Sequence, residues 1–393
     1  KKDGGKDLFA GEKETIVDKV SYTNLIIGRK YKVSGKLMNK ETGKPVLDNG
    51  KEVTAEKEFT AETSNGFVNL EFTFNATALA GKTVVVFEDV YQDKIKVATH
   101  ADITDEEQSV YIPNIGTKLT GKDSEEKEFH AFDKIELKDV MKYENLIKGK
   151  VYYAKGELIN KKTGKVIQKA EGNFIADEES GEASLDFTIN AKDLKGSELV
   201  CFEEIYTIDE EGNTNKLVAE HKDINDKGQT VKIVEPKIGT QAKADNGKKN
   251  VTEKKEITII DKVAYQDLIT GKEYTIKGKL MDKTTGKPLL INGKEVSAEK
   301  KFIAKEKSGF EELTFTFDGT GLGGKTVVVF EDVYEDGKLI GTHSDINDEG
   351  QSIKIIKKDT PKTGDKENYI YYVLGLLAAG GIVTYIRIKR AKK

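Results

Sequence analysis

Apolar and polar residues alternate with a period of two along several short segments of the chain. The segment 31–37, Tyr-Lys-Val-Ser-Gly-Lys-Leu, shows this alternation, and segment 274–280 repeats it. Successive side chains of a strand point to opposite faces, so the period predicts β-strands with one buried face. Further strands are predicted at 69–74, 83–91 and 108–112, and no segment before the C-terminal tail sustains the 3.6-residue period of a helix.

A turn of the form Lys-x-Thr-Gly-Lys follows the alternating segment and occurs three times, ending at Lys44, Lys165 and Lys287. Glycine near the end of such a segment suits the positive φ of a hairpin connection. Many short strands between turns are typical of a β-sandwich. We therefore predict an all-β fold of three tandem immunoglobulin-like β-sandwich repeats, followed by a C-terminal transmembrane helix.

The repeat is set by a nine-residue pattern, His-x-Asp-Ile-x-Asp-x-x-Gln. It begins at His100, His221 and His343, in steps of 121 and 122 residues, and accounts for three of the four histidines. The steps predict three β repeats, at 1–113, 114–235 and 236–357, and a tail at 358–393. A residue this scarce, held in register beside a glutamine, indicates chemistry more than packing.

Composition narrows the function classes. Charged residues make up 34% of the chain and the net charge is only −4, with both signs interspersed, which argues against a nucleic-acid-binding protein. The single cysteine, Cys201, stands in an apolar segment and is interpreted as a small buried hydrophobe. We expect no cofactor and no bound metal.

Carboxylates occupy the apolar face of two predicted strands in every repeat. One strand carries Asp18, Asp139 and Asp261, and a later strand carries Glu88, Glu203 and Glu331. A buried carboxylate is costly unless it is paired or protonated, so these acids indicate a polar cluster. Two alternatives stay open: the strands are edges with solvated acids, or the neighbouring acids face inward instead, namely Asp89, Glu204 and Asp332.

A candidate nucleophile lies near the start of the second and third repeats, in the segments Ile-Gly-Thr that end at Thr117 and Thr240. Thr117 precedes Gln229 by 112 residues and Thr240 precedes Gln351 by 111. Each could equally be an ordinary strand threonine.

Together, the Ile-Gly-Thr segment, the mid-strand aspartate, the Val-Phe-Glu strand and the histidine pattern resemble the T-Q ester-bond domains (VaFE repeats) of Gram-positive surface adhesins and pilus-like proteins. The resemblance covers nearly all of residues 1–357. It implies that a threonine hydroxyl attacks a glutamine side-chain amide, ammonia leaves, and an intramolecular ester joins the first and last strands. The implied pairs are Thr117 with Gln229 and Thr240 with Gln351. The implied assisting groups are Asp139, Glu203, His221, Asp261, Glu331 and His343.

This chemistry suits the residue types. A hydroxyl needs a base within hydrogen-bond reach, for which histidine is suited, and a protonated acid could polarise the amide. Which group plays which part stays open at this point. Each domain would react once on itself, so we do not expect an enzyme.

Repeat one departs from the pattern. It has Asp18, Glu88, His100 and Gln108, but alignment with repeat three places its threonine three positions before Lys1. Gln108 is therefore expected to be unpaired, and the chain is expected to be the C-terminal part of a longer protein.

The tail carries a second signal. The pentapeptide Thr360-Pro361-Lys362-Thr363-Gly364 precedes an apolar run at 369–386 and a basic end. An 18-residue apolar run is just long enough to span a bilayer, and a plain membrane anchor is one interpretation. The order of segments also resembles the cell-wall sorting signal of Gram-positive proteins, usually Leu-Pro-x-Thr-Gly.

That resemblance implies transit through the membrane and cleavage by a sortase between Thr363 and Gly364. Thr363 would then be joined to peptidoglycan or a pilus subunit at the cell surface. The expected function is an extracellular adhesin or pilus-like stalk whose ester bonds give mechanical and proteolytic stability, with any host ligand bound by upstream domains.

Three other functions are compatible with parts of the sequence. A pilin-type stalk with Lys–Asn isopeptide bonds would also use a buried acid, but would need neither the histidine nor the glutamine. A metal-binding adhesin repeat would use the segment 223–228, which loosely resembles a calcium loop but lacks the glutamate of an EF-hand. A Thr/His/Asp hydrolase would need a substrate cleft, which the sequence does not indicate.

Overall fold

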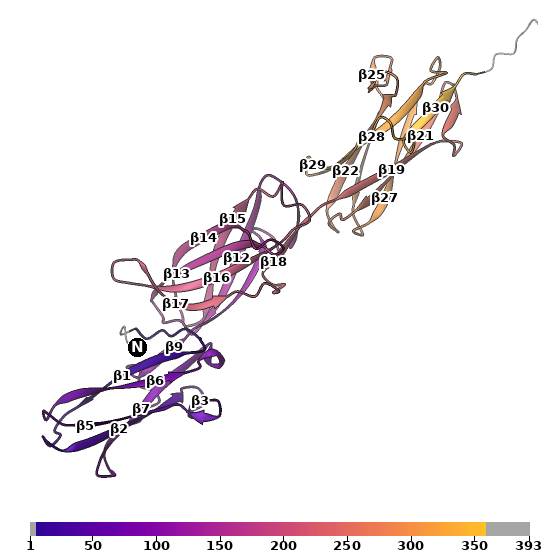
Figure 1. Cartoon of the computed structure of the whole chain (residues 1–393). Coiled ribbons are helices and arrows are strands. Elements are labelled where there is room, and N and C mark those ends of the chain that lie inside the picture. Colours follow the sequence, from indigo (N-terminus) through magenta and orange to yellow (C-terminus); the bar gives the residue numbers. More distant parts are fainter. Residues whose placement is uncertain (1–4, 359–393) are drawn as a thin grey trace, which may run out of the picture. The chain divides into compact units, whose positions relative to one another are not determined.

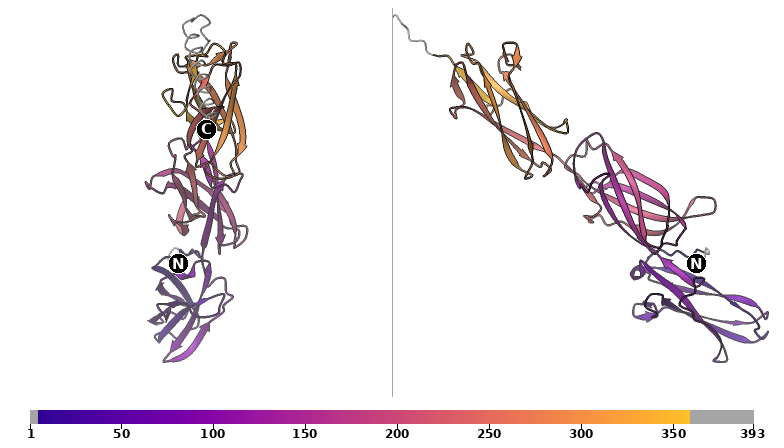
Figure 2. Two further views of the ribbon diagram at one scale, coloured as in Figure 1. Left: turned by 90° about the vertical axis from the view of Figure 1, so that its right-hand side faces the viewer. Right: turned by 180° about the vertical axis from the view of Figure 1, so that it is seen from behind.

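The computed structural model describes residues 5–358, which form three β-sandwich repeats (Figure 1; Figure 2). The all-β fold class and the threefold repeat predicted from the sequence are confirmed. The sorting pentapeptide and the predicted transmembrane helix lie outside the described residues. Within residues 5–358, no helix has the length and apolar character needed to cross a membrane.

Repeat two is built from two sheets. A three-stranded sheet has the order β10-β12-β15, and a six-stranded sheet has the order β11-β18-β16-β13-β14, with β17 also paired to β16. The strand bounds are β10 (Asn114–Gly121), β11 (Glu128–His130), β12 (Ile135–Glu144), β13 (Val151–Asn160), β14 (Val166–Ile175), β15 (Gly181–Ile189), β16 (Glu198–Ile208), β17 (Thr214–His221) and β18 (Thr230–Val234).

Repeat three has the same plan. Its sheets have the orders β19-β21-β27 and β20-β30-β28-β22-β23, with β26 also paired to β22, β29 paired to β28, and a small β24-β25 hairpin. The bounds are β19 (Lys237–Ala244), β20 (Asn250–Thr252), β21 (Ile257–Gln266), β22 (Glu273–Asp282), β23 (Lys287–Pro288), β24 (Leu290–Ile291), β25 (Lys294–Glu295), β26 (Ser297–Ile303), β27 (Gly309–Phe317), β28 (Thr326–Glu335), β29 (Lys338–His343) and β30 (Ser352–Ile356).

Repeat one differs in its smaller sheet, which contains only β1 and β6 among the described residues; the larger sheet has the order β5-β2-β7-β8, with β9 paired to β7. The bounds are β1 (Glu14–Tyr22), β2 (Lys30–Asn39), β3 (Leu47–Asp48), β4 (Lys51–Glu52), β5 (Thr54–Thr60), β6 (Gly66–Phe74), a 3₁₀ turn η1 (Thr77–Leu79), β7 (Lys82–Gln92), β8 (Ile95–His100) and β9 (Ser109–Ile112).

The first strand of repeats two and three brings the Ile-Gly-Thr segment onto the sandwich. β10 pairs antiparallel with β12, where Leu119 lies opposite Asp139, and β19 pairs with β21, where Ala242 lies opposite Asp261. The strand that follows the glutamine pairs with the glutamate strand, β18 with β16 and β30 with β28. The chain order therefore places the threonine and the glutamine at the two ends of each repeat.

The predicted turns are confirmed. Gly43, Gly164 and Gly286 have φ values of 63°, 68° and 65°, in the left-handed region that glycine adopts most easily. In the first turn, the Asn39 side chain accepts a hydrogen bond from Thr42 N at 2.9 Å. The turn is thus held by local side-chain and backbone bonds that its sequence supplies.

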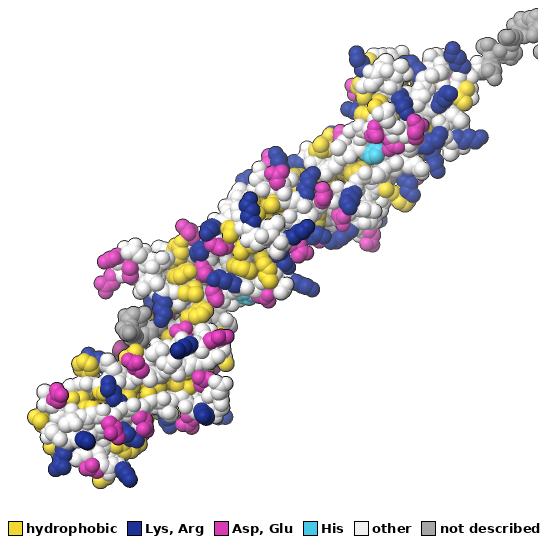
Figure 3. Space-filling view, in the orientation of Figure 1, with side chains coloured by type: hydrophobic (Ala, Val, Ile, Leu, Met, Phe, Trp, Pro, Cys, Tyr) yellow, Lys and Arg dark blue, Asp and Glu magenta, His cyan; other side chains and the backbone are white. Residues whose placement is uncertain are grey.

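A polar layer interrupts the apolar core between the sheets. In repeat two the buried apolar residues form two clusters, one containing Leu119 and Cys201 and the other containing Ile115 and Ile205. Alternation along a strand points Thr117, between Ile115 and Leu119, and Glu203, between Cys201 and Ile205, to the same interior. The surface of the molecule shows basic and acidic side chains interspersed, as the sequence indicates (Figure 3).

Candidate functional site

The acids of the polar layer are buried. The exposed fractions of Asp139 and Glu203 are both 0%, and those of Asp261 and Glu331 are 0% and 1%. The interpretation of these residues as solvated acids on edge strands is therefore wrong. The structure also decides between the two sets of acids, because Glu203 faces the interior whereas its neighbour Glu204 is partly exposed and pairs with Lys155 and Lys222.

The structure brings a hydroxyl, a carboxyl and an amide together in repeat two. The Thr117 Oγ1 hydroxyl donates a hydrogen bond to Glu203 Oε2 at 3.2 Å. The side-chain amide nitrogen of Gln229, which is fully buried, contacts both Thr117 Oγ1 and the same Glu203 oxygen. Glu203 and Gln229, which follow Thr117 by 86 and 112 residues, thus both contact its side chain.

Repeat three reproduces the contact between threonine and glutamate, but among the described residues the side-chain amide of Gln351 makes no hydrogen bond to Thr240 or Glu331. The Thr240 Oγ1 hydroxyl donates to Glu331 Oε2 at 3.3 Å, and Gln351 is fully buried. Gln351 lies beside Asp261: burial raises the pKa of this aspartate, while Glu331 and Gln351 lower it in part. In both repeats the threonine hydroxyl therefore contacts the buried glutamate of its own repeat.

The pKa values of both acids of each site are raised above their ordinary values. Burial raises the pKa of Glu203 to about 9, and the charge of Asp139 contributes to the rise. Burial also raises the pKa of Asp139, to about 6. Two adjoining carboxyl groups in a dry interior cannot both be ionised easily, so at neutral pH the glutamate holds a proton next to the aspartate. In repeat three, burial and Asp261 raise the pKa of Glu331 to about 10.

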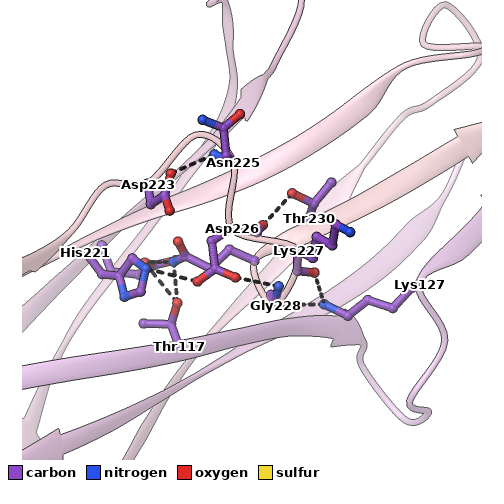
Figure 4. A network of polar contacts seen from close by, with 11 residues as sticks. Thr117, Lys127, His221, Asp223, Asn225, Asp226, Lys227, Gly228 and Thr230 are labelled. Atoms are coloured by element: carbon purple, nitrogen blue, oxygen red, sulfur yellow. Dashed lines mark hydrogen bonds and ion pairs between the residues drawn. The ribbon is translucent and has the colours of Figure 1, made fainter.

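The histidine of the repeated pattern lies beside this cluster and not between the reacting groups. His221 faces Glu203 in the register of β16 and β17, and its Nε2 pairs with Asp226 Oδ2 at 3.0 Å (Figure 4). His343 Nε2 pairs with Asp348 Oδ2 at 2.7 Å. The group in direct contact with the threonine hydroxyl is therefore the glutamate and not the histidine.

The loop that resembled a calcium site uses its carboxylates for other bonds. Asp223 Oδ1 accepts a hydrogen bond from Asn225 N at 2.8 Å, and Asp226 Oδ1 accepts one from Gly228 N at 2.6 Å (Figure 4). The other Asp226 oxygen binds His221. These bonds shape the turn that carries Gln229, which explains the aspartates without a cation.

One cluster of possible metal ligands lies within the described residues, formed by Asp139, Cys201 and Glu203, whose ligand atoms lie within 4.8 Å of one another. Cys201 is fully buried, as its apolar sequence context predicts, and burial raises the pKa of its thiol. The other repeats have valine at this position, Val86 and Val329. The features shared by the repeats are therefore the acid pair and the glutamine, and not a metal-ligand set.

Repeat one holds an incomplete version of the site. Asp18 and Glu88 are buried, with exposed fractions of 8% and 3%, and burial raises the pKa of Glu88 to about 10. His100 Nε2 pairs with Asp105 at 2.8 Å, as in the other repeats. Gln108, however, is only half-buried, and among the described residues no strand pairs with the outer edge of β1.

Sequence reasoning missed a lysine at the edge of each site. Lys127 Nζ donates to the carbonyl of Gly228, the residue before Gln229 (Figure 4). Lys249 Nζ makes the same contact with Gly350. The signal was present in the sequence, because Lys6, Lys127 and Lys249 follow the same steps of 121 and 122 residues as the histidines.

The fold and the site together define a β-sandwich repeat in which a threonine on the opening strand meets a glutamine beside the closing strand. The chain belongs to the family of the T-Q ester bond containing domain, whose family model matches residues 1–112, 113–233 and 236–355.

Solved structures with similar folds include a bacterial adhesin from Mobiluncus mulieris that contains intramolecular disulfide, isopeptide and ester bond cross-links. One of its crystal forms has 17% identity over 56% of this chain and 80% of the adhesin chain, with a TM-score of 0.29. A second form has 16% identity over 62% and 96%, with a TM-score of 0.30. The C-terminal domain of the Streptococcus agalactiae AgI/II polypeptide BspA has 11% identity over 58% and 98%, with a TM-score of 0.32. No curated protein sequence matches the chain.

Proposed function

We propose that repeats two and three each crosslink themselves through an ester between threonine and glutamine, Thr117 with Gln229 and Thr240 with Gln351. The observation that carries the proposal is the position of Glu203, whose Oε2 contacts the threonine hydroxyl and the glutamine amide nitrogen at once. The reaction must remove a proton from the threonine hydroxyl and deliver one to the glutamine amide nitrogen.

The bonds balance without a cofactor. The threonine oxygen attacks the side-chain carbonyl carbon of glutamine, its O–H bond breaks, and a C–O bond forms. The protonated glutamate delivers its proton to the amide nitrogen, and the carboxylate that this leaves takes up the hydroxyl proton. The C–N bond then breaks and ammonia leaves. Each repeat reacts once on its own chain, so it is not a turnover enzyme.

The acid pair prepares the glutamate for this exchange. With the glutamate protonated beside the aspartate, a proton is available to the departing nitrogen. The histidine, paired with its own aspartate, lies next to the pair and lowers the pKa of Asp139 in part, against the larger effect of burial. Burial of Gln229 also keeps water away from the product ester.

For the whole protein, we propose an extracellular stalk of a Gram-positive surface adhesin or pilus-like protein. The family membership, the acid pair in every repeat and the pentapeptide at 360–364 support it. A sortase would join Thr363 to peptidoglycan or to a pilus subunit after transit through the membrane. Upstream domains would bind the host ligand.

Intact mass tests the crosslinks. The purified, folded chain should weigh two ammonia molecules less than its sequence, and Thr117→Ala should restore one of them. Digestion should yield a linked peptide pair from each repeat. A folded chain with its full sequence mass would rule out the ester.

Cell fractionation tests the anchoring. The chain is expressed in a Gram-positive cell behind a secretion signal of that cell, and it should be recovered from the wall fraction. Thr363→Ala should shift it to the membrane fraction, whereas Lys362→Ala, at the variable position of the motif, should not. Equal wall attachment of the Thr363→Ala variant would contradict the sortase assignment.

A further inference from the structure

The lysine at the edge of the site is attached at two points that bracket the reacting glutamine. The backbone carbonyl of Lys127 accepts a hydrogen bond from Lys232 N at 2.8 Å, three residues after Gln229. Its side-chain ammonium donates to the carbonyl of Gly228, immediately before Gln229. One residue therefore ties together the turn in front of the glutamine and the strand behind it.

Repeat three has the same double attachment. The carbonyl of Lys249 accepts a hydrogen bond from Lys354 N at 2.9 Å, three residues after Gln351. Its ammonium donates to Gly350 O, and also to Ala242 O at 2.7 Å. Ala242 stands two residues after Thr240, so this lysine reaches the threonine strand as well.

The glycine carbonyl that the lysine holds is also the point where the threonine strand meets the glutamine turn. Gly228 O accepts a second hydrogen bond from Leu119 N at 3.0 Å, two residues after Thr117. Gly350 O likewise accepts one from Ala242 N at 3.1 Å. The carbonyl therefore connects three segments: the strand with the nucleophile, the turn with the amide, and the lysine.

Repeat one shows what changes where no threonine strand is described. Lys6 Nζ donates to Glu106 O at 2.7 Å. In repeat two the equivalent carbonyl, Lys227 O, lies 3.5 Å from Lys127 Nζ, which contacts Gly228 O as well. Gln108 is only half-buried there, whereas Gln229 and Gln351 are fully buried. The three-segment junction and the buried glutamine thus occur together.

We propose that Lys127 and Lys249 are positioning residues for ester formation, which hold the glutamine side chain against the threonine hydroxyl by fixing the glycine carbonyl before it. The proposal rests on the ester chemistry proposed above and adds a group to it. A small displacement of one reacting group from its attack position costs a large factor in rate, so a clamp beside the glutamine has direct kinetic value.

The ammonium is suited to this position by its surroundings. Burial lowers the pKa of Lys127 and nearby Lys118 lowers it further, while Asp226 and Asp139 favour the charged form. Asp226 belongs to the histidine pair and Asp139 to the acid pair. The cation therefore stands among the anionic groups of the site, with the carbonyl as its hydrogen-bond acceptor.

The test uses Lys127→Met in the full chain, with repeat three as an internal reference in every molecule. After cell-free synthesis, samples taken over time are digested, and the linked peptide pair Thr117–Gln229 is measured against the pair Thr240–Gln351. We expect the ester of repeat two to form about 10- to 100-fold more slowly, with repeat three unchanged. Lys127→Arg, which keeps a cation with several donors, should restore most of the rate.

Lys122→Met is the matched control, because Lys122 lies on the same connection but pairs with exposed Asp186. It should leave both esters at their normal rate. Equal rates for Lys127→Met and the parent chain would overturn the proposal. A second result would also overturn it. If Lys127→Arg forms the ester as slowly as Lys127→Met, and both variants lower the melting temperature of repeat two equally, the lysine only supports the fold. Absence of both esters in the parent chain would instead reject the proposed function.

Discussion

Glu203 and Glu331 are each surrounded by apolar residues on their own strand, yet each contacts the threonine hydroxyl of its repeat. An unpaired buried carboxylate would be strongly destabilising, so the acid keeps its proton and has an aspartate beside it. A protonated acid in contact with a hydroxyl and an amide can transfer protons between them. The same residue would be a poor choice for stability alone.

Replacement of this glutamate should stop the reaction in one repeat only. In Glu331→Gln the amide matches the carboxyl in shape but neither accepts nor releases the proton, so ester formation in repeat three should slow by about 10²- to 10⁴-fold. Intact mass should then show one ammonia lost, and peptide mapping should place the remaining ester in repeat two. Normal formation of both esters would show that the glutamate has no part in proton transfer.

Repeat one allows the buried acid to be studied without an ester. The pKa of Glu88 rises from its ordinary value of 4.5 to about 10, chiefly through burial and then through Asp18. Between these values the folded repeat holds a proton that the unfolded chain has lost. The contribution of Glu88 protonation to the stability of the repeat is therefore complete below about pH 4.5 and falls as the pH rises toward 10.

Calorimetry of the full chain at pH 5 to 9 should show this in the lowest-temperature transition, which we assign to repeat one. That transition should move to lower temperature as the pH rises, and Glu88→Gln should remove most of the dependence. A pH-independent transition in the parent chain would mean that Glu88 ionises normally.

The sequence allowed the site to be predicted in part. Period-two alternation put aspartates and glutamates among apolar neighbours, and the resemblance supplied the pairs Thr117–Gln229 and Thr240–Gln351. Alternation could not choose between Glu203 and Glu204, because that choice depends on which face meets the second sheet. Alternation also could not predict the lysine contacts, because each joins a side chain to a backbone carbonyl about 100 residues away.

At the scale of the strands, a glycine in the second strand makes room for the opposite sheet. A Cβ added at Gly156 would lie 2.9 Å from Leu185 Cδ1 and 3.0 Å from Phe187 Cζ. Gly35 and Gly278, at the equivalent positions, face Phe72 and Phe315 in the same way. The glycine lies in regular strand and is required by packing and not by backbone conformation.

Gly156→Ala should therefore destabilise repeat two by about 1–3 kcal/mol through overpacking. The neighbouring strand provides the control, because a Cβ at Gly172 in β14 meets no atom within 4 Å and Gly172→Ala should change little. The measurement is the melting temperature of repeat two for both variants. Equal effects would indicate that the core adjusts freely around the added methyl group.

Strand prediction worked where alternation was strong and missed other strands both long and short, such as the ten-residue β14. The segments 31–37 and 83–91 fall within β2 and β7, and 274–280 falls within β22. The three-residue strands β11 and β20 were not predicted, because a parallel pairing with the last strand is set by the tertiary fold and leaves no period in so short a segment.

At the scale of the molecule, repeats two and three have a threonine strand, β10 and β19, that repeat one lacks among the described residues. Under tension the chain enters repeat two at β10 and leaves it at β18, and the proposed ester joins these two ends. The ester would close the loop between Thr117 and Gln229, which are 112 residues apart. By analogy with disulfides, closing it also removes unfolded-state entropy worth roughly 4–5 kcal/mol. Repeat one, as described, has neither benefit.

Stretching of single molecules of the 393-residue chain should show one domain that unfolds at ordinary force while two stay closed. A segment with Ile-Gly-Thr, placed ahead of Lys1 with the spacing of repeat three, should abolish that event. Unfolding of all three repeats at similar force would contradict the load-bearing role of the ester. Persistence of the event in the extended chain would contradict the position of the missing threonine.

The location of the two reacting residues at opposite ends of a repeat also determines what happens when the chain is cut. Once Thr117 and Gln229 are joined, residues 117–229 form a covalent ring within a linear polymer. A glutamyl endopeptidase that nicks the exposed β16–β17 turn, at Glu210 or Glu211, opens the ring but creates no separate fragment. On a denaturing gel the nicked chain would still run as one molecule, and alkali, which hydrolyses esters, would release two. A surface protein built this way can be cut once in each closed repeat without being shed.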